Sequence, residues 1–387
     1  MKKALILTAS TGAGHNQAAK TLENLYNDKE YETYIFDFLK NSSSLLNFIV
    51  ADGYEILAKN IPKVYGDIYR ISDKEFINDK LLKKVFVPVK RKVLKKIMDI
   101  RPEIIIATHP LAVSIVSRLK EKGFINIPFI SIVTDYKAHY AYVDKNVDAY
   151  VTGSLYTKNS LIKRNISKEK IFSYGIPIRE DFFTNIYEEN KNEEFSILIM
   201  GGSMGLKDIA PVLKDIIKSN HNNLNITVIC GKNEKLKNSL LEDYSPKIDG
   251  KKINIIGFTK DVPKYMEKNN LIISKPGGLT VSESIAKNIP MVIPFAIPGQ
   301  EEENTEFLVQ SGAAIKVNNN EEINKIINYL VENEEDYNRL KANMYKLSRC
   351  FALENIINLS DKLIYKYNNE FLDIERNDKR KLFRIIS

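Results

Sequence analysis

The chain has 387 residues, of which 44% are hydrophobic and 27% charged, and its formal net charge is +8 at pH 7. This composition is that of a folded protein, and no window approaches the roughly 18 continuous apolar residues of a membrane span. The length predicts two domains of somewhat under about 200 residues each, with a cleft between them.

The start of the chain and its cysteines bear on the cellular compartment. Met1-Lys2-Lys3 leads directly into an expected strand, so we expect no signal peptide. Cys230 and Cys350 are far apart in the sequence and predict neither a disulfide framework nor a metal site. These features favour a cytoplasmic protein.

The first half of the chain alternates short β-branched segments with helical patterns. The expected strands are residues 4–8, 33–38, 103–107, 129–133 and 149–152. Such alternation is typical of a parallel sheet covered by helices. We therefore predict an α/β domain in this half.

A glycine cluster, residues 10–16, follows the first expected strand and opens a helix. Gly12 and Gly14, with Asp37 at the end of the next strand, approximate a dinucleotide-binding fingerprint. A nicotinamide-dependent oxidoreductase is therefore one hypothesis. Gln17 stands where the fingerprint has its third glycine, so the match is weak.

Residues 80–99 form a basic segment with eight Lys or Arg residues against one acid. Beyond Pro88, the apolar positions 89, 93, 94 and 97 fall on one helical face. The basic residues that flank this face are Lys90, Arg91, Lys92, Lys95 and Lys96. This pattern predicts a helix at an anionic membrane surface, and the alternative is an ordinary surface helix. Residues 45–61 are a second candidate for lipid contact, again ambiguous with core packing.

Three polar side chains are candidates to line the cleft. His15 lies at a helix start, whose positive end disfavours the charged imidazole, so it is our first candidate for a general base. Asp135 and His139 follow the strand 129–133, at the edge where parallel sheets place ligands. The alternatives are that His15 only caps a turn and that Asp135 only bonds loop amides. A structural role is favoured for His109, and a solvated loop position for His221.

The segment from Gly175 through residues 187–194 interrupts the pattern and is interpreted as a linker. After it the alternation of strands and helices resumes. The expected strands are residues 195–200, 226–230, 252–256, 271–274, 291–294 and 313–317. Residues 321–367 are helical by spacing, and the tail from residue 373 onward is basic and mixed.

Four turns of the second half suggest a nucleotide site. Residues 201–205, Gly-Gly-Ser-Met-Gly, follow a strand and let a phosphate approach the backbone at Gly202 and Ser203. Phe258 follows another strand and is a candidate to flank a base, with a core position as the alternative. Residues 275–283, Lys-Pro-Gly-Gly-Leu-Thr-Val-Ser-Glu, turn into a helix whose first amides predict a diphosphate site. The polar run 298–304 could bind the hydroxyls of a sugar.

Together these motifs resemble the diacylglycerol glycosyltransferases, the group of monogalactosyldiacylglycerol synthase and processive diacylglycerol glucosyltransferase. The group is similar in turn to the transferase that adds N-acetylglucosamine to lipid I in peptidoglycan synthesis. The resemblance runs from Leu5 to about Ala314. Its specific parts are residues 11–15, 134–136 with His139, 201–205, 275–278 and 298–304.

The resemblance implies a GT-B fold, in which two Rossmann-like domains with parallel sheets face a central cleft. Residues 1–175 would form the acceptor and membrane-binding domain, 176–194 a linker, 195–350 the nucleotide-sugar domain, and 351–387 a C-terminal helix and basic tail. It also implies a UDP-sugar site, with Glu283 at the ribose, Phe258 at the uracil, and Gln300, Glu301 and Asn304 at the sugar. The implied diphosphate contacts are Gly277, Gly278, Leu279 and Thr280. Gly14, His139 and Tyr142 would lie on the acceptor side.

Two positions depart from the pattern that the resemblance leads us to expect. Tyr142 stands where relatives often carry a tryptophan, which puts the acceptor contacts in doubt. Asn288 replaces a glycine at the end of a helix. Asparagine tolerates the left-handed backbone conformation, so we expect this change to be harmless.

The implied reaction is inverting transfer of a hexose, glucose favoured over galactose, from a UDP donor to diacylglycerol, with further addition to the product left open. No cofactor and no bound metal are expected. Amides at Gly278 to Thr280 would take up charge on the leaving diphosphate, while His15 or, second, Asp135 deprotonates the acceptor hydroxyl. The expected partners are the UDP-sugar, diacylglycerol and an anionic membrane, without nucleic acid, since no binding motif accompanies the basic residues. The expected location is peripheral, at the cytoplasmic face of the membrane.

Three alternatives remain beside this interpretation. One is transfer of N-acetylglucosamine to a peptidoglycan lipid precursor. A second is the oxidoreductase built on Gly12, Gly14 and Asp37, which should bind NADH. The third is a sugar-nucleotide sensor that binds its ligand without turnover.

Overall fold

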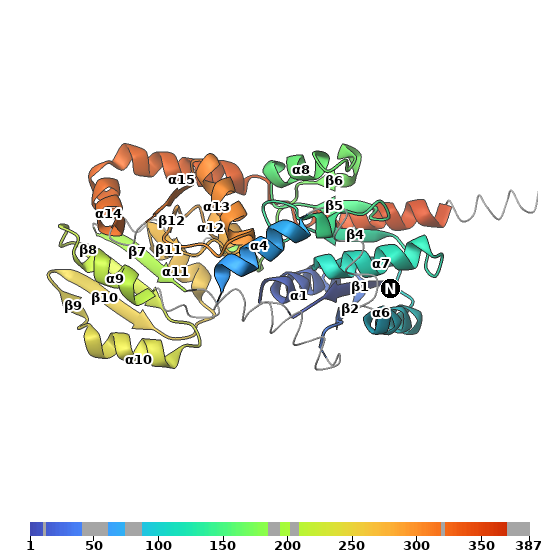
Figure 1. Ribbon diagram of the computed structural model, residues 1–387, viewed down its shortest axis with the longest axis horizontal. Helices are drawn as coiled ribbons and strands as arrows, with labels where there is room; N and C mark the ends of the chain where they lie inside the picture. The colour runs from blue at the N-terminus through green and yellow to red at the C-terminus, as the bar shows by residue number, and fades with distance from the viewer. Residues whose placement is uncertain are drawn as a thin grey trace, which may run out of the picture.

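The computed structural model describes residues 1–10, 13–40, 61–73, 87–184, 194–201, 209–318 and 322–369. Two α/β domains lie side by side along the long axis of the molecule, each built around one sheet (Figure 1). The two sheets come from separate halves of the sequence, as the restart of the strand pattern predicted. Within these described ranges no helix combines the length and hydropathy that crossing a membrane requires.

The first sheet has six parallel strands in the order β2-β1-β3-β4-β5-β6. The strands are β1 Lys2–Thr8, β2 Tyr31–Asp37, β3 Ile104–Ala107, β4 Phe129–Ile132, β5 Ala149–Val151 and β6 Ile171–Phe172. The five expected strands are all present. Strands β1, β3, β4 and β5 are largely buried, whereas the edge strand β2 is mostly half-buried. Only the two-residue strand β6 escaped prediction.

Helices cover both faces of this sheet. The helices are α1 Ala13–Asn27, α6 Val87–Ile100, α7 Pro110–Glu121 and α8 Leu155–Ile162. The apolar side of α6 does not face outward, because Val89, Val93 and Ile97 are buried in one core with Leu5 and Leu7 of β1. The expectation that these side chains insert into a bilayer is therefore wrong. Of the basic residues, Arg91, Lys92 and Lys95 are exposed and Lys90 and Lys96 partly buried.

The second sheet has seven strands in the order β13-β12-β11-β7-β8-β10-β9. The strands are β7 Phe195–Met200, β8 Leu224–Ile229, β9 Lys247–Ile248, β10 Lys251–Ile256, β11 Leu271–Ser274, β12 Met291–Ile293 and β13 Ala314–Lys316. Only the short β9 is antiparallel. Its helices are α9 Ile209–Ile217, α10 Glu234–Asp243, α11 Val262–Lys268, α12 Gly278–Ala286, α13 Gln300–Gln310, α14 Ile323–Glu332 and α15 Glu334–Ser348.

The chain crosses between the domains twice. After α15 it returns to the first domain, where the helix of residues 355–369 packs on the first sheet (Figure 1). Ile356 lies in one core with Ala4 and Ile6, and the hydroxyls of Tyr26 and Ser360 are bonded at 2.5 Å. The two crossings contact each other, since the Ala352 amide donates to the Tyr174 carbonyl oxygen at 3.0 Å.

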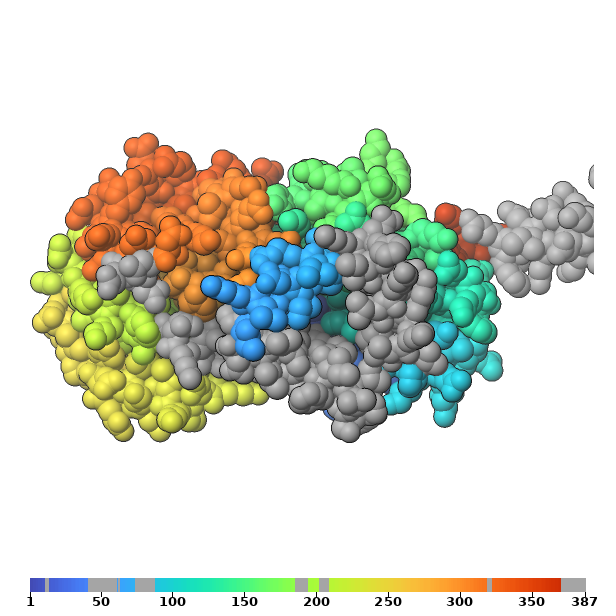
Figure 2. Space-filling model, viewed as in Figure 1, coloured from blue at the N-terminus to red at the C-terminus, as the bar shows by residue number. Residues whose placement is uncertain are grey.

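Helix α4, Pro62–Ser72, belongs in sequence to the first domain but lies across the junction of the two domains (Figure 1). In the space-filling view α4 forms part of the molecular surface and borders the second domain (Figure 2). A Cβ on Gly66 of α4 would lie 2.6 Å from the Cβ of Pro298. The absence of a side chain at Gly66 therefore allows the helix to pack directly against the loop that contains Pro298. This contact brings a first-domain helix against the start of α13.

Candidate functional site

The site forms where the carboxyl ends of β4 and β11 meet across the domain junction. Gly278, the first residue of α12, packs against the loop after β4: a Cβ added there would lie 2.2 Å from the carbonyl oxygen of Thr134. Because only glycine permits this approach, Gly278 also sets how closely the domains meet. Leu279 follows and lies 3.8 Å from the ideal Cβ position of Gly14 on α1.

The start of α12 carries the features expected of a diphosphate site. The first backbone bond of the helix runs from the Val281 amide to the Gly277 carbonyl oxygen at 2.9 Å. The amides of Gly278, Leu279 and Thr280 precede it and have no partner within the helix. Apart from its chain neighbours, no heavy atom of the described residues lies within 4 Å of the ideal Cβ position of Gly277, so this end of the helix is open among them. An anion there would be bound by the helix N-terminus.

His15 occupies the first turn of α1 with its tautomer fixed. Its Nδ1 lies 2.7 Å from the carbonyl oxygen of Thr108, which can only accept, so the proton is on Nδ1. Nε2 then carries the lone pair. Burial lowers the pKa of His15 to about 4, against the opposing effect of the Thr108 carbonyl bond. His15 is therefore a neutral imidazole near pH 7 with a basic Nε2, as a general base requires.

Two polar side chains, Thr134 and Tyr142, connect His15 to the core of the first domain. The hydroxyl of Thr134 lies 3.2 Å from Nδ1 of His15 and 2.9 Å from the hydroxyl of Tyr142. Tyr142, expected on the acceptor side, is buried, and its hydroxyl contacts that of Thr134. His109 packs edge-on against His15 with ring centroids 4.5 Å apart, and its Nδ1 accepts from the Leu111 amide as a helix cap.

Asp135 lies at the junction and is shared by both domains. The side-chain amide of Gln300, the first residue of α13, donates to Oδ1 of Asp135. Burial raises the pKa of Asp135 to about 7, and the Gln300 bond opposes that rise. Glu303 and Glu301 repel the charged form and raise the pKa further. The carboxyl group can therefore exchange its proton near neutrality, so it is a second candidate base.

The loop after β4 is bound into the second domain beyond Asp135. The Tyr136 amide donates to Asn304 at 2.9 Å, and the Asn304 amide donates to the Pro276 carbonyl oxygen at 3.0 Å. The Tyr136 ring stacks on Phe307 with centroids 4.3 Å apart, and its hydroxyl is bonded to that of Ser282 at 2.9 Å. Asn304, expected at the sugar, thus connects the domains.

Glu301, also expected at the sugar, is engaged within its own domain. Its Oε1 lies 2.6 Å from Lys275 Nζ, and its Oε2 accepts from the Ile297 amide at 2.9 Å. The carboxylate therefore holds the turn at Lys275 against the loop that precedes α13. In this arrangement, the side chains of Gln300 and Asn304 reach Asp135 from the polar run, whereas that of Glu301 does not.

The expected nucleoside contacts lie on the second domain. Burial raises the pKa of Glu283 to about 8, Arg179 opposes this rise, and Asp181 adds to it. Phe258 is 60% exposed, so the alternative of a core position is wrong. Lys232 Nζ lies 5.8 Å from the centre of the Phe258 ring. An exposed aromatic ring beside a cation is suited to stack on a base.

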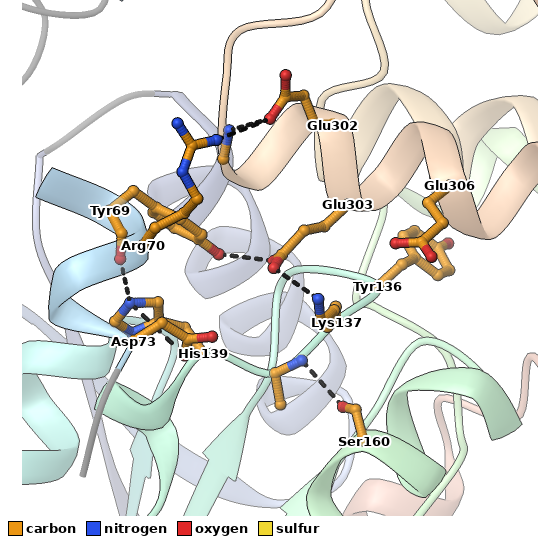
Figure 3. A network of polar contacts seen from close by, with 12 residues as sticks. Tyr69, Arg70, Asp73, Tyr136, Lys137, His139, Ser160, Glu302, Glu303 and Glu306 are labelled. Carbon is orange, nitrogen blue, oxygen red and sulfur yellow. Dashed lines mark hydrogen bonds and ion pairs between the residues drawn. The ribbon is translucent and has the colours of Figure 1, made fainter. Parts of the chain in front are cut away.

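A polar network extends the site toward α4 (Figure 3). The Tyr69 hydroxyl donates to Glu303 of α13 at 2.8 Å, and Lys137 forms an ion pair with the same carboxylate at 3.0 Å. His139 lies beside them: its Nδ1 accepts from the Ala141 amide at 3.0 Å, and its Nε2 lies 3.3 Å from the Tyr69 carbonyl oxygen. Nε2 therefore carries the proton. Burial lowers the pKa of His139.

Some expectations fall outside the described residues or are satisfied differently. Gly12, Gly202, Ser203 and most of the second lipid-contact candidate, residues 45–61, lie outside them. Asp37 already accepts from Ser10 and from the amides of Leu39 and Lys40, the latter two at 3.1 Å. The Asp37 carboxylate therefore stabilises the loop that follows β2, which is a structural role. His221 lies in a loop and is 3.2 Å from Glu332.

Sequence reasoning missed the residues that support the site from a distance. Thr108 fixes the His15 tautomer, and Tyr69 and Glu303 connect α4 to α13. Glu303 stands inside the polar run that was singled out. Tyr69 had no such signal, because one tyrosine in a short helix is typical of any amphipathic segment. In the part of the chain that the structure describes, no group of three or more His, Cys, Asp or Glu residues is arranged to hold a metal ion.

Comparisons with known proteins show which family the chain resembles. A family model described as monogalactosyldiacylglycerol (MGDG) synthase matches residues 15–178, and one described as glycosyltransferase family 28 C-terminal domain matches residues 196–358. The processive diacylglycerol beta-glucosyltransferase of Bacillus cereus (strain G9842) is 30% identical over 332 residues, 83% of each chain. That of Bacillus pumilus (strain SAFR-032) is 29% identical over 375 residues, 93% of this chain and 96% of its own.

The crystal structure of Acinetobacter baumannii MurG has a TM-score of 0.59 to this chain. It is 15% identical and covers 93% of this chain and 99% of its own. At this identity the likeness shows the fold alone, which is GT-B. The predicted fold class is therefore confirmed.

Proposed function

Because the chain belongs to the diacylglycerol glycosyltransferase family, we propose that it transfers a hexose from a UDP-sugar to diacylglycerol. Glucose is the favoured sugar, as in the printed names of the bacillar relatives, and the product can accept a further sugar. The observation that carries the proposal is the approach of Gly278 to Thr134, which brings the amide-rich end of α12 to His15 and Asp135.

The reaction needs charge stabilisation on the donor side. As the sugar leaves, negative charge gathers on the diphosphate while the anomeric carbon gains oxocarbenium character. The amides of Gly278, Leu279 and Thr280 are fixed in the helix and would stabilise this charge without reorganising. Phe258 would stack on the uracil and Glu283 would accept from the ribose hydroxyls.

The acceptor side needs a base. The diacylglycerol hydroxyl loses its proton as it attacks, and Nε2 of His15 is our first choice to receive it. Asp135 is the second choice, because its pKa of about 7 allows proton exchange at neutral pH. Attack opposite the leaving group inverts the anomeric centre and yields a β-linked sugar from an α-linked donor.

A lipid acceptor stays in the bilayer, so we propose that the enzyme works as a peripheral protein at the cytoplasmic face of the membrane. The net charge of +8 and the basic side of α6 favour an anionic surface. Since the apolar side of α6 is buried, the contribution of this helix would be electrostatic. Its side chains for that contact would be Lys90, Arg91, Lys92, Lys95 and Lys96.

The test is incubation of purified protein with diacylglycerol vesicles and, separately, UDP-glucose, UDP-galactose or UDP-N-acetylglucosamine, followed by mass spectrometry of the lipids. We expect a mass increase of one or more hexoses with UDP-glucose and a β-anomeric proton in the product NMR spectrum. Absence of any glycolipid with all three donors would contradict the proposal. Transfer only to a peptidoglycan lipid precursor would favour the first alternative instead.

A further inference from the structure

Helix α4 has two faces of different character. Its outward face carries four large apolar side chains: Ile61 just before the helix, then Val64, Ile68 and Ile71, which are 51%, 43%, 50% and 52% exposed. Their spacing of three and four residues places them in one stripe. Four such side chains in a row on a surface helix are more than the scattered apolar residues that a protein surface normally shows.

The inward face of α4 holds the start of α13. A Cβ on Gly299 would lie 2.8 Å from the Tyr69 ring, so the ring rests on the backbone of the loop before α13. The Tyr69 hydroxyl donates to Glu303 at 2.8 Å. Glu303 is one turn from Gln300, whose amide bonds Asp135. Tyr69 thus acts on the site through α13 without pointing at the α12 amides.

The other end of α4 is fixed to the first domain. Asp73, which caps the helix, forms an ion pair with Arg164 at 2.8 Å and accepts from the Tyr140 amide at the same distance. Arg164 in turn lies over the Tyr140 ring, 4.0 Å from its centre. Helix α4 is therefore attached to both domains, and its position depends on how closely they approach (Figure 3).

We propose that α4 couples membrane contact to closure of the donor site. The outward stripe contacts the bilayer surface. On the opposite side of the helix, Tyr69 holds α13 and Gln300 in the position in which Gln300 bonds Asp135. Tyr69 is thus a positioning residue for the donor side. This inference rests on the proposed function, because it takes the bilayer that contains the acceptor as the occupant of the stripe.

Two observations favour a bilayer over another protein. The apolar stripe stands on a helix with the exposed cation Lys63, which suits lipid head groups around inserted side chains. Arg70 is also exposed, but it is paired with Asp67 at 2.8 Å. The helix that carries the stripe also contacts Gly299 and Glu303 beside the candidate site, which must receive a bilayer-resident hydroxyl. Membrane contact at this stripe would stabilise α4 in the position in which it contacts both domains.

The experiment measures UDP affinity by calorimetry with and without vesicles of equal parts phosphatidylglycerol and phosphatidylcholine, which contain no diacylglycerol and so permit no turnover. We expect vesicles to tighten UDP binding of the unaltered protein about fivefold or more. Val64→Ser with Ile68→Ser should abolish this gain and weaken vesicle binding. Tyr69→Phe, which keeps the ring on Gly299 and removes the bond to Glu303, should abolish the gain while vesicle binding persists.

The matched control is Leu241→Ser on α10, a comparably exposed apolar residue of the second domain, which should leave both readouts unchanged. The inference is overturned if vesicles leave the UDP affinity of the unaltered protein unchanged, or if Tyr69→Phe retains the full gain. Absence of UDP binding in every condition would instead overturn the proposed function. If UDP binds with the same affinity with and without vesicles, only the proposed coupling is refuted.

Discussion

The side-chain amide of Gln300 donates a hydrogen bond to the carboxylate of Asp135 across the junction of the two domains. The two residues are 165 positions apart, and both belong to motifs that the sequence singled out. Their contact joins the candidate base on the acceptor side to the helix proposed for the donor sugar. Asp135 therefore depends on domain closure both for its position and for its pKa.

The pH dependence of turnover distinguishes the two candidate bases. A base acts when deprotonated, so activity falls as pH drops through its pKa. With His15 as base, the acidic limb of kcat/KM should lie near pH 4, and with Asp135 as base near pH 7. We expect the former. An acidic limb near pH 7 that disappears in Asp135→Asn would assign the role to Asp135.

Loss of His15 should affect turnover far more than donor binding. His15→Ala removes the proposed base, and kcat should fall by about 10² to 10⁴. UDP affinity, measured by calorimetry, should stay within about twofold, because a base acts on the acceptor and not on the nucleotide. His221→Ala, in a loop of the second domain, is the matched control. Unchanged kcat in His15→Ala would refute the assignment.

Adding one methyl group to Gly278 should separate the domains. The Cβ would lie 2.2 Å from the Thr134 carbonyl oxygen, so Gly278→Ala must push the first domain away from α12. We expect a larger radius of gyration by small-angle scattering and a loss of about 10² in kcat/KM. In Gly277→Ala the new Cβ would meet no atom within 4 Å among the described residues beyond its chain neighbours, so the radius should not change. Equal radii for both variants would contradict this account of the junction.

Phe258 should contribute to nucleotide binding and little to stability. Phe258→Ala removes a largely exposed ring, and loss of stacking on a base costs about 1–3 kcal/mol, so the UDP dissociation constant should rise about 5- to 150-fold. The melting temperature should barely change. Phe124→Ala, whose ring is 50% exposed in the first domain, should leave UDP binding intact. Wild-type affinity in Phe258→Ala would remove the residue from the site.

Glu283 should make stability depend on pH. Burial raises its pKa to about 8, so the folded protein holds this proton more tightly than the unfolded chain. The stability that results is present below the ordinary pKa of a glutamate and is lost as pH rises toward 8. Glu283→Gln cannot ionise, so its melting temperature should exceed that of the unaltered protein by about 2–4 °C at pH 9 for each kcal/mol removed. At pH 5 the two should nearly coincide.

The control for Glu283 is Glu242→Gln on the surface of α10. Its melting temperature should stay close to that of the unaltered protein at both pH 5 and pH 9. A Glu283→Gln protein that melts below the unaltered one at pH 9 would show that the carboxylate stabilises the fold in its charged form.

The sequence predicted the strands well because buried β-branched runs leave a local pattern. It also predicted that Asn288 can close α12 in place of glycine, and its φ of 55° confirms the left-handed conformation. It could not tell on which side the apolar stripe of α6 lies, because a core-facing and a lipid-facing helix share one pattern. The stripe buried in α6 and the stripe exposed on α4 show this ambiguity in one chain.

The sequence singled out motifs that the fold brings together, but it did not predict the contacts among them. The motifs at His15, Asp135, Gly278 and Gln300 meet because parallel strands end at one edge of each sheet. Glu301 and Asn304 were expected at the sugar, yet they hold Lys275 and Tyr136. Such roles depend on distances between residues far apart in the chain, and no local pattern encodes them.

The pairing of the two interdomain crossings limits how the molecule can open. Gly175, with φ of 89°, lies in the first crossing, and a Cβ there would be 2.3 Å from the Phe351 ring of the second. The Cys350 thiol adds a contact to the Gly153 carbonyl oxygen at 3.2 Å. Two chain segments that are fixed side by side would act as a single hinge in a rigid-body opening of the domains. An opening about this axis would leave the contacts between the two crossings intact while it separated α12 from the Thr134 loop.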